Sequence, residues 1–492
     1  MRPLHSARYG RPSCNFLRAG GPQVTYIAVG ATSARSDSRA AIYLALLSLA
    51  AVYFLAWPVW RAQFLIEIWP TESWNAYLQD AVGTGAPLYP DPASLIGNNY
   101  PPLSFYAVAM LGKLTGTDNL FAGRALSLVA LASIALEIFA AVRILAGGRL
   151  GAAVGALWYL AIMARNSTVY IGTNDPQLAG EAIMGAGLVY FLSLCRRNQP
   201  PLPALLLMVI AGFWKHNNVA IPLAAIAWLF IDCNRNALRA TVMSGAAAVA
   251  GLAACAVIFG SDFLPNLLAN RDYSWSNVLG NIGHLQWCAL AAMIWAAWAI
   301  CDRQSPAARF TALHIGLGLF ACILQWFGHG VSGNAEFDLI LALGIGTGVA
   351  FTRIEASWLA RRIGPGHCRD LMIAALLIRF VAADRQETAL LLLSNDFSAS
   401  LYTSERNTLL EAEKVAAIPG DASCFTKLVC RIAGKPFVVD EFKTGEMIET
   451  GRVTQTEMSE VLAAHKIRWI PTVLWAQPNT SISAWLRNGR QL

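Results

Sequence analysis

The sequence predicts an α-helical polytopic membrane protein with about eleven transmembrane helices, interfacial helices in the first outer loop and a small C-terminal α/β domain. The first observation is composition: hydrophobic residues make up 56% of the 492 residues, and charged residues make up 14%. The second is that long apolar runs recur from about position 40 to position 382 and then stop. We therefore divide the chain into a disordered cytoplasmic N-terminus (1–38), a transmembrane domain (39–383) and an extracytoplasmic α/β domain (384–492).

The first 35 or so residues are rich in arginine, glycine and serine and show no apolar period, so we expect them to be disordered. The apolar run that follows is too long for a cleaved signal peptide and is interpreted as an uncleaved anchor. The expected transmembrane helices lie at 40–60, 120–142, 150–164, 177–195, 201–213, 218–231, 240–260, 278–300, 310–327, 336–351 and 368–383.

Arginine residues indicate which side of the membrane each loop faces. If the N-terminus is cytoplasmic, the segments on the inner side hold 18 basic residues, all of them arginine. The opposite segments between 61 and 336 hold six, which are Arg61, Lys113, Arg124, Arg165, Lys215 and Arg271. This excess follows the positive-inside rule. It predicts a multi-pass protein of the plasma (inner) membrane with its C-terminal domain outside the cytoplasm.

This orientation requires that the apolar segment 101–116 does not cross the bilayer. The segment is short for a transmembrane helix and begins with Pro101 and Pro102. It also carries Tyr106 and Lys113, which suit the boundary between lipid and water. We therefore expect it to lie along the outer surface of the membrane.

The net charge of +7 comes mostly from the inner loops, so it predicts contact with anionic membrane lipid and no nucleic-acid partner. Of the ten cysteines, only Cys424 and Cys430 fall in the outer domain. An oxidising compartment would permit a disulfide between them. The sequence does not supply the geometry that a disulfide needs, so their pairing stays open at this point.

The C-terminal domain alternates helix-like and strand-like segments. The helix-like segments are 404–417 and 454–466, and the strand-like segments lie within 420–430, 435–442 and 467–475. Such alternation predicts a small α/β domain.

Two carboxylates stand at the outer ends of predicted transmembrane helices. Glu72 lies just beyond the first one, where partial desolvation can raise the pKa of a carboxyl group and let it accept a proton from a hydroxyl. The alternative is that Glu72 only stabilises the N-terminal turn of the helix that follows. Asp175 precedes Pro176 at the mouth of another transmembrane helix, and its alternative role is that of an N-cap.

Lys215 and His216 lie in a short outer connection between two apolar helices. The positive-inside rule disfavours a lysine on this side, and an anionic ligand would account for it. The alternative is a lysine at a helix end that extends its ammonium group to the membrane surface.

Several short motifs follow Glu72 in a fixed order: GAPLYP (85–90), NYPPLSFY (99–106), LTG (114–116), then Arg124 and Asp175. In this order the chain resembles the C-type glycosyltransferase superfamily. It is most similar to the branch that contains the family 39 protein O-mannosyltransferases and the lipid A aminoarabinose transferases. The resemblance implies a multispan enzyme that transfers a sugar from a polyprenyl-phosphate donor to a lipid, glycan or protein acceptor outside the cytoplasm.

The resemblance also implies roles for individual residues. Glu72 is expected to be the general base or to help hold a metal, and Asp175 is the acidic residue of the second outer loop. The cations expected to bind the carrier phosphate are Arg124, Arg165 and Lys215. The remaining residues that we place in the substrate site are His216, Tyr100 and Asn334.

Two departures from the family pattern affect these expectations. Thr71 precedes Glu72 where the family often has a second acidic residue, which makes a two-carboxylate metal site in this loop less favoured. No cofactor is predicted with certainty, and a divalent metal stays an open option. Tyr100 stands where the family often has a lysine before the two prolines, so phosphate binding is expected to shift to Lys215.

Two alternatives to a glycosyltransferase stay open. A transporter or flippase of lipid-linked sugars would also have many transmembrane helices, but it would not need a long structured outer loop, and it would more often show an internal repeat. A non-catalytic membrane subunit that binds through its outer domain is the third option.

Overall fold

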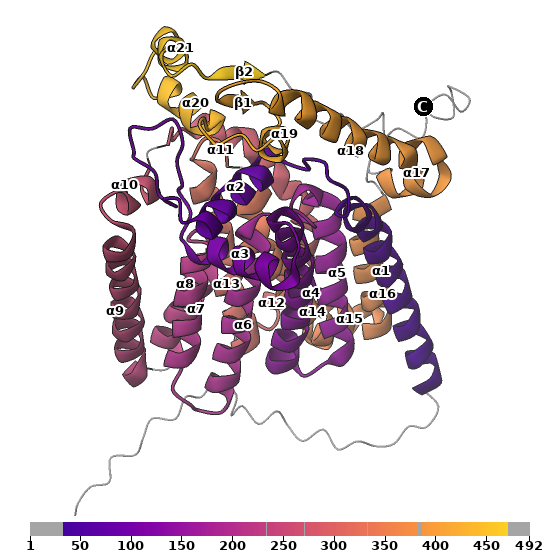
Figure 1. Ribbon diagram of the computed structural model, residues 1–492. Coiled ribbons are helices and arrows are strands. Elements are labelled where there is room, and N and C mark those ends of the chain that lie inside the picture. The colour runs from indigo at the N-terminus through magenta and orange to yellow at the C-terminus, as the bar shows by residue number, and fades with distance from the viewer. Residues whose placement is uncertain (1–32, 233, 270, 332, 382–385, 471–492) are drawn as a thin grey trace, which may run out of the picture.

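The computed structural model of the protein describes residues 33–470 apart from 233, 270, 332 and 382–385. Long apolar helices form a bundle, and the segment 387–470, here called the cap, lies across one end of it (Figure 1). Residues 1–32, which belong to the segment expected to be disordered, lie outside the described residues. The first helix begins at Ser33, so the last part of that segment is helical.

The bundle is built from helices that match the predicted apolar runs. They are α1 (Ser33–Arg61), α4 (Asn119–Ala146), α5 (Arg149–Asn166), α6 (Pro176–Arg196), α7 (Leu202–Trp214), α8 (Ala220–Asp232), α9 (Asn234–Phe259), α12 (Ala289–Ala299), α13 (Pro306–Trp326), α14 (Phe337–Thr352) and α16 (Pro365–Val381). The short helices between them are η1 (Thr168–Tyr170), α10 (Phe263–Leu267), α11 (Trp275–Asn281), η2 (Ile282–Trp287), η3 (Gly333–Glu336), η4 (Ile354–Ala356) and α15 (Trp358–Ile363).

Helix α14 lies at the centre of the bundle and is buried over nearly its whole length. It approaches α5 closely, because Gly151 and Gly155 of α5 face Gly344 and Gly348 of α14. A Cβ atom added to Gly155 would lie only 2.4 Å from the carbonyl oxygen of Gly344. Small residues at this spacing let two apolar helices pack without intervening side chains, as in membrane helix pairs.

The polytopic membrane fold is confirmed, but the predicted number of eleven crossings is not. Among the described residues, six helices are long and apolar enough to cross a membrane, or up to seven if the bent pair Trp275–Trp287 and Ala289–Ala299 is one span. Three further apolar helices, α3 (Leu103–Thr115), α7 and α8, are shorter. The expected spans fall on helices, but several of these helices are too short to count as crossings by themselves.

The first outer loop folds into α2 (Pro70–Thr84) and α3 (Leu103–Thr115), which pack against each other at the end of the bundle that carries the cap (Figure 1). Pro70 opens α2, where a proline fits the first turn. Gly85 ends α2 with φ 75°, a left-handed conformation that favours glycine. The position of α3 along the membrane surface stays a prediction.

Between residues 387 and 470, the described part of the C-terminal segment, the cap contains five helices and two short strands. These are α17 (Glu387–Leu393), α18 (Asn395–Ala416), β1 (Ala422–Cys424), α19 (Lys427–Ile432), α20 (Glu441–Glu449), α21 (Gln455–Ala464) and β2 (Arg468–Ile470). The strands pair in parallel with Ala422 opposite Arg468. A parallel pair needs a crossover connection, and the helices between β1 and β2 supply it.

The secondary structure of the cap differs in part from the prediction. Residues 420–430 form a strand of only three residues followed by α19. Residues 435–440 form no strand, and Glu441 begins α20 instead. Their backbone contacts explain the difference, since Asp440 N–H donates to the carbonyl oxygen of Leu95 in the first outer loop rather than to a neighbouring strand. Of the last predicted strand, residues 471–475 lie outside the described residues.

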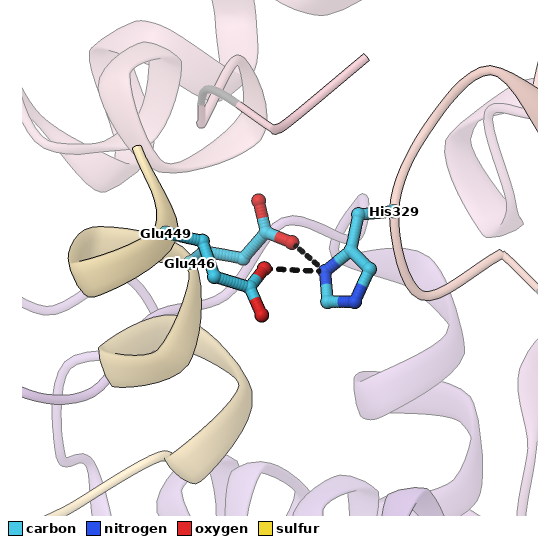
Figure 2. A group of neighbouring side chains, drawn as sticks. All are labelled: His329, Glu446 and Glu449. Carbon is cyan, nitrogen blue, oxygen red and sulfur yellow. Dashed lines mark hydrogen bonds and ion pairs between the residues drawn. The ribbon is translucent and has the colours of Figure 1, made fainter. Parts of the chain in front are cut away.

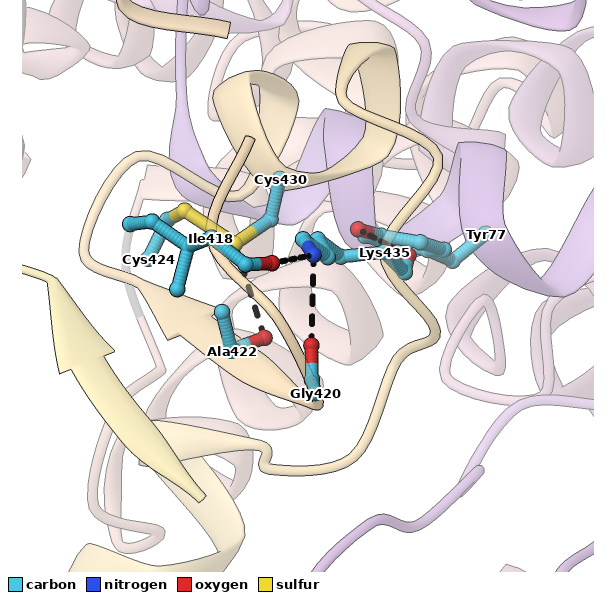
Figure 3. Close-up of a disulfide and its surroundings, with 7 residues drawn as sticks. All are labelled: Tyr77, Ile418, Gly420, Ala422, Cys424, Cys430 and Lys435. Atoms are coloured by element: carbon cyan, nitrogen blue, oxygen red, sulfur yellow. Dashed lines mark hydrogen bonds between the residues drawn. A yellow bond between two sulfur atoms is a disulfide. The ribbon is translucent and has the colours of Figure 1, made fainter. Parts of the chain in front are cut away.

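Cys424 and Cys430 form a disulfide inside the cap (Figure 3). Next to it, the Lys435 ammonium donates to the carbonyl oxygens of Ile418 at 2.5 Å and Gly420 at 3.2 Å. The Tyr77 hydroxyl of α2 donates to the carbonyl oxygen of Lys435 at 3.1 Å. The disulfide region is therefore joined directly to the first outer loop.

A second connection between the cap and the bundle is made by Arg431 of α19. Its guanidinium lies 2.7 Å from Asp80 of α2 and 2.9 Å from Asp118, which precedes α4. The Arg431 side chain is only 10% exposed, and the two carboxylates raise its pKa above the ordinary value despite burial. One cation thus holds three segments together.

We expect Arg431→Ala to loosen the cap and to increase its proteolytic cleavage at least several-fold, because two carboxylates lose their shared partner. The measurement is the rate of limited proteolysis in detergent, followed by intact mass. Arg406→Ala is the matched control, since Arg406 is an exposed arginine on α18 of the same cap. Equal cleavage rates in the two variants would show that Arg431 does not hold the cap in place.

Candidate active site

Glu72 and Arg124 form a buried ion pair at the start of the first outer loop. Glu72 lies in the first turn of α2 and is 0% exposed, while Arg124 of α4 is 1% exposed. Arg124 Nη2 is 2.6 Å from Glu72 Oε1, and Nε is 3.1 Å from Oε2. The backbone N–H groups of Ile68 and Asn174 donate to the same carboxylate at 2.7 and 3.3 Å. Both oxygens of Glu72 are therefore held by donors.

The rest of the Arg124 guanidinium binds the loop between α1 and α2. Nη1 donates to the carbonyl oxygens of Ala62 at 3.1 Å and Phe64 at 2.6 Å, and Nη2 donates to Ile66 at 2.6 Å. Every nitrogen of Arg124 thus has a protein partner. The expected roles of Glu72 as general base and of Arg124 as a phosphate ligand stay predictions, and these contacts favour a positioning role for both.

Asp175 is the N-cap of α6, as its alternative role in the sequence suggested. Its Oδ1 accepts a hydrogen bond from the Gln177 N–H at 2.8 Å. The preceding residue, Asn174, exchanges hydrogen bonds with Gln79 of α2 at 2.8 and 3.0 Å, and its carbonyl oxygen accepts from Asn75. Asp175 therefore follows directly on a segment that is fixed to α2 and Glu72.

Lys215 is buried beside Tyr100. The Lys215 Nζ lies 3.1 Å from the centre of the Tyr100 ring, and the Lys215 residue is 3% exposed. Burial lowers the pKa of Lys215 to about 7, while the negative charge of Asp175 acts in the opposite direction. Burial raises the pKa of Tyr100 above its ordinary value, so the phenol stays neutral. Because the Lys215 ammonium is already shielded from water, binding of an anion to it requires little further desolvation of the cation.

Electrostatic interactions connect Asp175, Lys215 and Tyr100 with two further residues that the sequence did not assign to the site. The charge of Arg271 acts on both Lys215 and Tyr100. Asp440 of the cap accepts a hydrogen bond from Trp74 Nε1 at 3.1 Å, and the Trp74 ring packs 5.1 Å from Tyr100. Arg271 was visible in the sequence as an outer cation, whereas nothing in the sequence linked Asp440 to α2.

The other predicted site residues have different surroundings. His216 follows Lys215 and is exposed. Asn334 Nδ2 donates to Gln177 Oε1 at 3.4 Å, near the start of α6. Arg165 lies elsewhere, over the ring of Trp287 at 4.2 Å. The structure thus brings Asp175, Lys215 and Tyr100 together and places Arg165 apart from them.

Only one group within the described ranges has three side chains that could jointly hold a metal ion. It consists of His329, Glu446 and Glu449, and it joins the segment after α13 to α20 of the cap (Figure 2). His329 Nδ1 is 2.5 Å from Glu446 Oε1 and 3.0 Å from Glu449 Oε2. A protonated histidine accounts for the same contacts, so the metal question raised by the sequence stays open.

No protein-family model matches the sequence, and no curated protein matches it significantly. The chain is similar to the crystal structure of ArnT from Cupriavidus metallidurans in the apo state, with 15% identity over 93% of this chain and 95% of that chain and a TM-score of 0.55. The fold implied by the sequence resemblance is confirmed.

Two further solved structures match with lower scores. ArnT from Cupriavidus metallidurans bound to undecaprenyl phosphate is 13% identical over 87% of this chain and 91% of that chain, with a TM-score of 0.50. The oligosaccharyltransferase of Archaeoglobus fulgidus in the apo form is 11% identical over 86% of this chain and 69% of that chain, with a TM-score of 0.44.

The lowered pKa of Lys215 predicts how anion binding depends on pH. Below a pH of about 7 the ammonium is charged, and above it the amine is neutral, so the affinity for a phosphodiester should fall as the pH rises through about 7. The phosphodiester itself does not titrate there. The measurement is binding of a polyprenyl phosphodiester across that range, with Lys215→Arg as the control that stays charged. If Lys215→Arg showed the same fall in affinity with pH as the wild type, the titration of Lys215 would not be its cause.

Proposed function

We propose that the protein is a membrane glycosyltransferase that transfers a sugar from a polyprenyl-phosphate-linked donor to a lipid, glycan or protein acceptor outside the cytoplasm. The observation that carries the proposal is the group of buried Lys215, buried Asp175 and half-buried Tyr100 at the cap end of a C-type glycosyltransferase fold. The ArnT structure that shares this fold binds undecaprenyl phosphate. A phosphate-linked carrier lipid is the ligand that a buried cation at the end of apolar helices would suit.

In the proposed reaction, the acceptor oxygen forms a bond to the anomeric carbon of the sugar. The bond from that carbon to the phosphate oxygen breaks, and its electron pair leaves with the polyprenyl phosphate. Lys215 and Arg271 stabilise the negative charge that grows on the leaving phosphate. The proton of the acceptor hydroxyl passes to a carboxylate, which later releases it to water.

Asp175 is the carboxylate that we propose for proton transfer. It interacts electrostatically with Lys215 and Tyr100, so it belongs to the same group as the proposed phosphate site. Glu72 contacts the preceding residue, Asn174, and both of its carboxylate oxygens are bound by Arg124 and backbone N–H groups. A carboxylate that has to leave an arginine before it accepts a proton is a poor base. Glu72 would then act by positioning Asn174 and the start of α6.

The test is transfer of a radiolabelled sugar from a small panel of polyprenyl-phosphate sugars by the purified protein, with and without a chelator. Turnover by the wild type and its loss in Asp175→Asn are the expected results, while Glu413→Gln on the exposed face of α18 should be unaffected. Transport of the lipid-linked sugar without any transfer would overturn the proposal and support a transporter.

A further inference from the structure

A second group of cations lies at the cap end of the bundle, apart from the site around Lys215. Arg165 is the penultimate residue of α5, and Arg379 lies in the last turn of α16. Both side chains contact Trp287, the last residue of η2. Figure 1 shows α5 and α16 toward one side of the bundle and α7, which precedes Lys215, toward the other.

Both guanidinium groups lie over the same indole ring. The Arg165 guanidinium carbon is 4.2 Å from the centre of the Trp287 ring, and the Arg379 carbon is 3.6 Å from it. The two guanidinium carbons are therefore within about 8 Å of each other, and two positive charges at that separation repel each other. The indole ring offsets part of this cost, because its π-electrons attract cations.

Arg379 has hydrogen-bond donors that no described residue satisfies. Its Nε and Nη2 atoms are buried from solvent and have no partner within the described part of the chain. The amide nitrogen of Asn166 is likewise buried without a partner, while the Asn166 amide oxygen accepts from Arg165 Nη1 at 2.6 Å. Glu336, which precedes α14, is paired with His284 at 2.8 Å.

These donors have the chemistry of an anion site. A guanidinium with a free Nε and Nη2 presents the two parallel N–H groups that bind one phosphate in a bidentate manner. An adjacent amide nitrogen adds a neutral donor, and a tryptophan is suited to the level of the lipid headgroups. Unsatisfied buried donors of a charged group are costly, so a ligand that satisfies them is strongly favoured.

We propose that Arg379, Arg165, Asn166 and Trp287 form a binding site for the phosphate of a membrane phospholipid, separate from the site around Lys215. The occupant is a lipid because the site lies at the ends of apolar bundle helices, where α16 carries the exposed apolar side chains Leu371 and Ile378 that would contact acyl chains. The proposal does not depend on the transfer reaction, and it concerns lipid binding in the resting protein.

The test is retention of lipid by the purified full-length protein in native mass spectrometry, with titrated dioleoyl phosphatidic acid as the probe. Dioleoylglycerol, which has the same chains and no phosphate, is the comparison ligand. We expect the wild type to bind phosphatidic acid at least tenfold more tightly than dioleoylglycerol, and Arg379→Met to remove that difference. Arg379→Lys should retain part of it, because a lysine keeps the charge and loses the paired donors.

The chain offers a matched control in Arg362, which lies 5.5 Å from the centre of the Trp358 ring in an exposed arginine and tryptophan pair. Arg362→Met should bind phosphatidic acid like the wild type, and a melting curve shows that each variant is folded. The proposal would be overturned if Arg379→Met bound phosphatidic acid as tightly as the wild type does. It would also be overturned if the wild type bound dioleoylglycerol as tightly as phosphatidic acid. Loss of polyprenyl phosphate binding alone in Arg379→Met would overturn it too, since the site would then belong to the donor.

Discussion

Lys215→Met is expected to lower the rate of sugar transfer by at least about 100-fold, the usual cost of removing one fixed group that stabilises developing negative charge. Lys215 is buried against Tyr100, so methionine fills a similar volume and removes only the charge and its donors. Because the proposed charge develops on the leaving phosphate, kcat should fall in addition to the loss of donor affinity expected when Lys215 is uncharged.

The control for this prediction is Lys113→Met on α3. Lys113 is an exposed lysine of the same predicted outer face, so the control removes an equal charge outside the site. Transfer rates of both variants are measured with the same polyprenyl-phosphate sugar. Full activity of Lys215→Met would remove Lys215 from the mechanism and leave the donor phosphate without its main proposed ligand.

Glu72→Gln is expected to destabilise the protein by about 3–5 kcal/mol, because it leaves the Arg124 guanidinium buried without its countercharge. Arg124 also holds three carbonyl groups of the α1–α2 connection, so the loss should spread to the whole first outer loop. The measurement is the thermal unfolding midpoint in detergent, recorded together with the transfer rate of the folded fraction.

Glu355→Gln is the matched control, because Glu355 forms an ion pair with Arg369 at 3.2 Å and is 69% exposed. An exposed pair of this kind contributes at most about 1 kcal/mol. The double variant Glu72→Gln with Arg124→Met should recover part of the lost stability, since no charge then stays buried alone. A variant Glu72→Gln that melts like the wild type yet has lost all transfer would instead favour the general-base role.

Sequence patterns were sufficient for the helical part of this protein. Apolar runs of helix length exclude most other structures, so the ranges of α4, α6 and α13 could be predicted closely. The Asp-Pro pair at 175–176 marked the start of α6 for the same kind of local reason, since an N-cap depends only on its neighbours in the chain. The number of membrane crossings could not be predicted from the sequence. It depends on helix tilt and bending, which are set by packing between helices.

The cap shows where local patterns fail. Residues 435–440 are apolar enough for a strand, yet they have no neighbouring strand to pair with and contact the first outer loop instead. Strand formation depends on a partner that is distant in sequence. The pairing of Cys424 with Cys430 stayed open for the same reason, because it depends on the path of the chain around β1.

The sequence by itself determined the membrane-embedded fold class, the candidate residues Asp175, Lys215 and Tyr100, and the expected donor class. Only the tertiary structure decided that Glu72 faces Arg124, that Arg165 lies with Arg379 rather than with Lys215, and that the cap contributes Asp440 to the first outer loop. The physical reason is the range of the forces involved. Hydrophobic length and capping act between neighbours in the chain, whereas ion pairs and buried donors are set by contacts between segments that fold together.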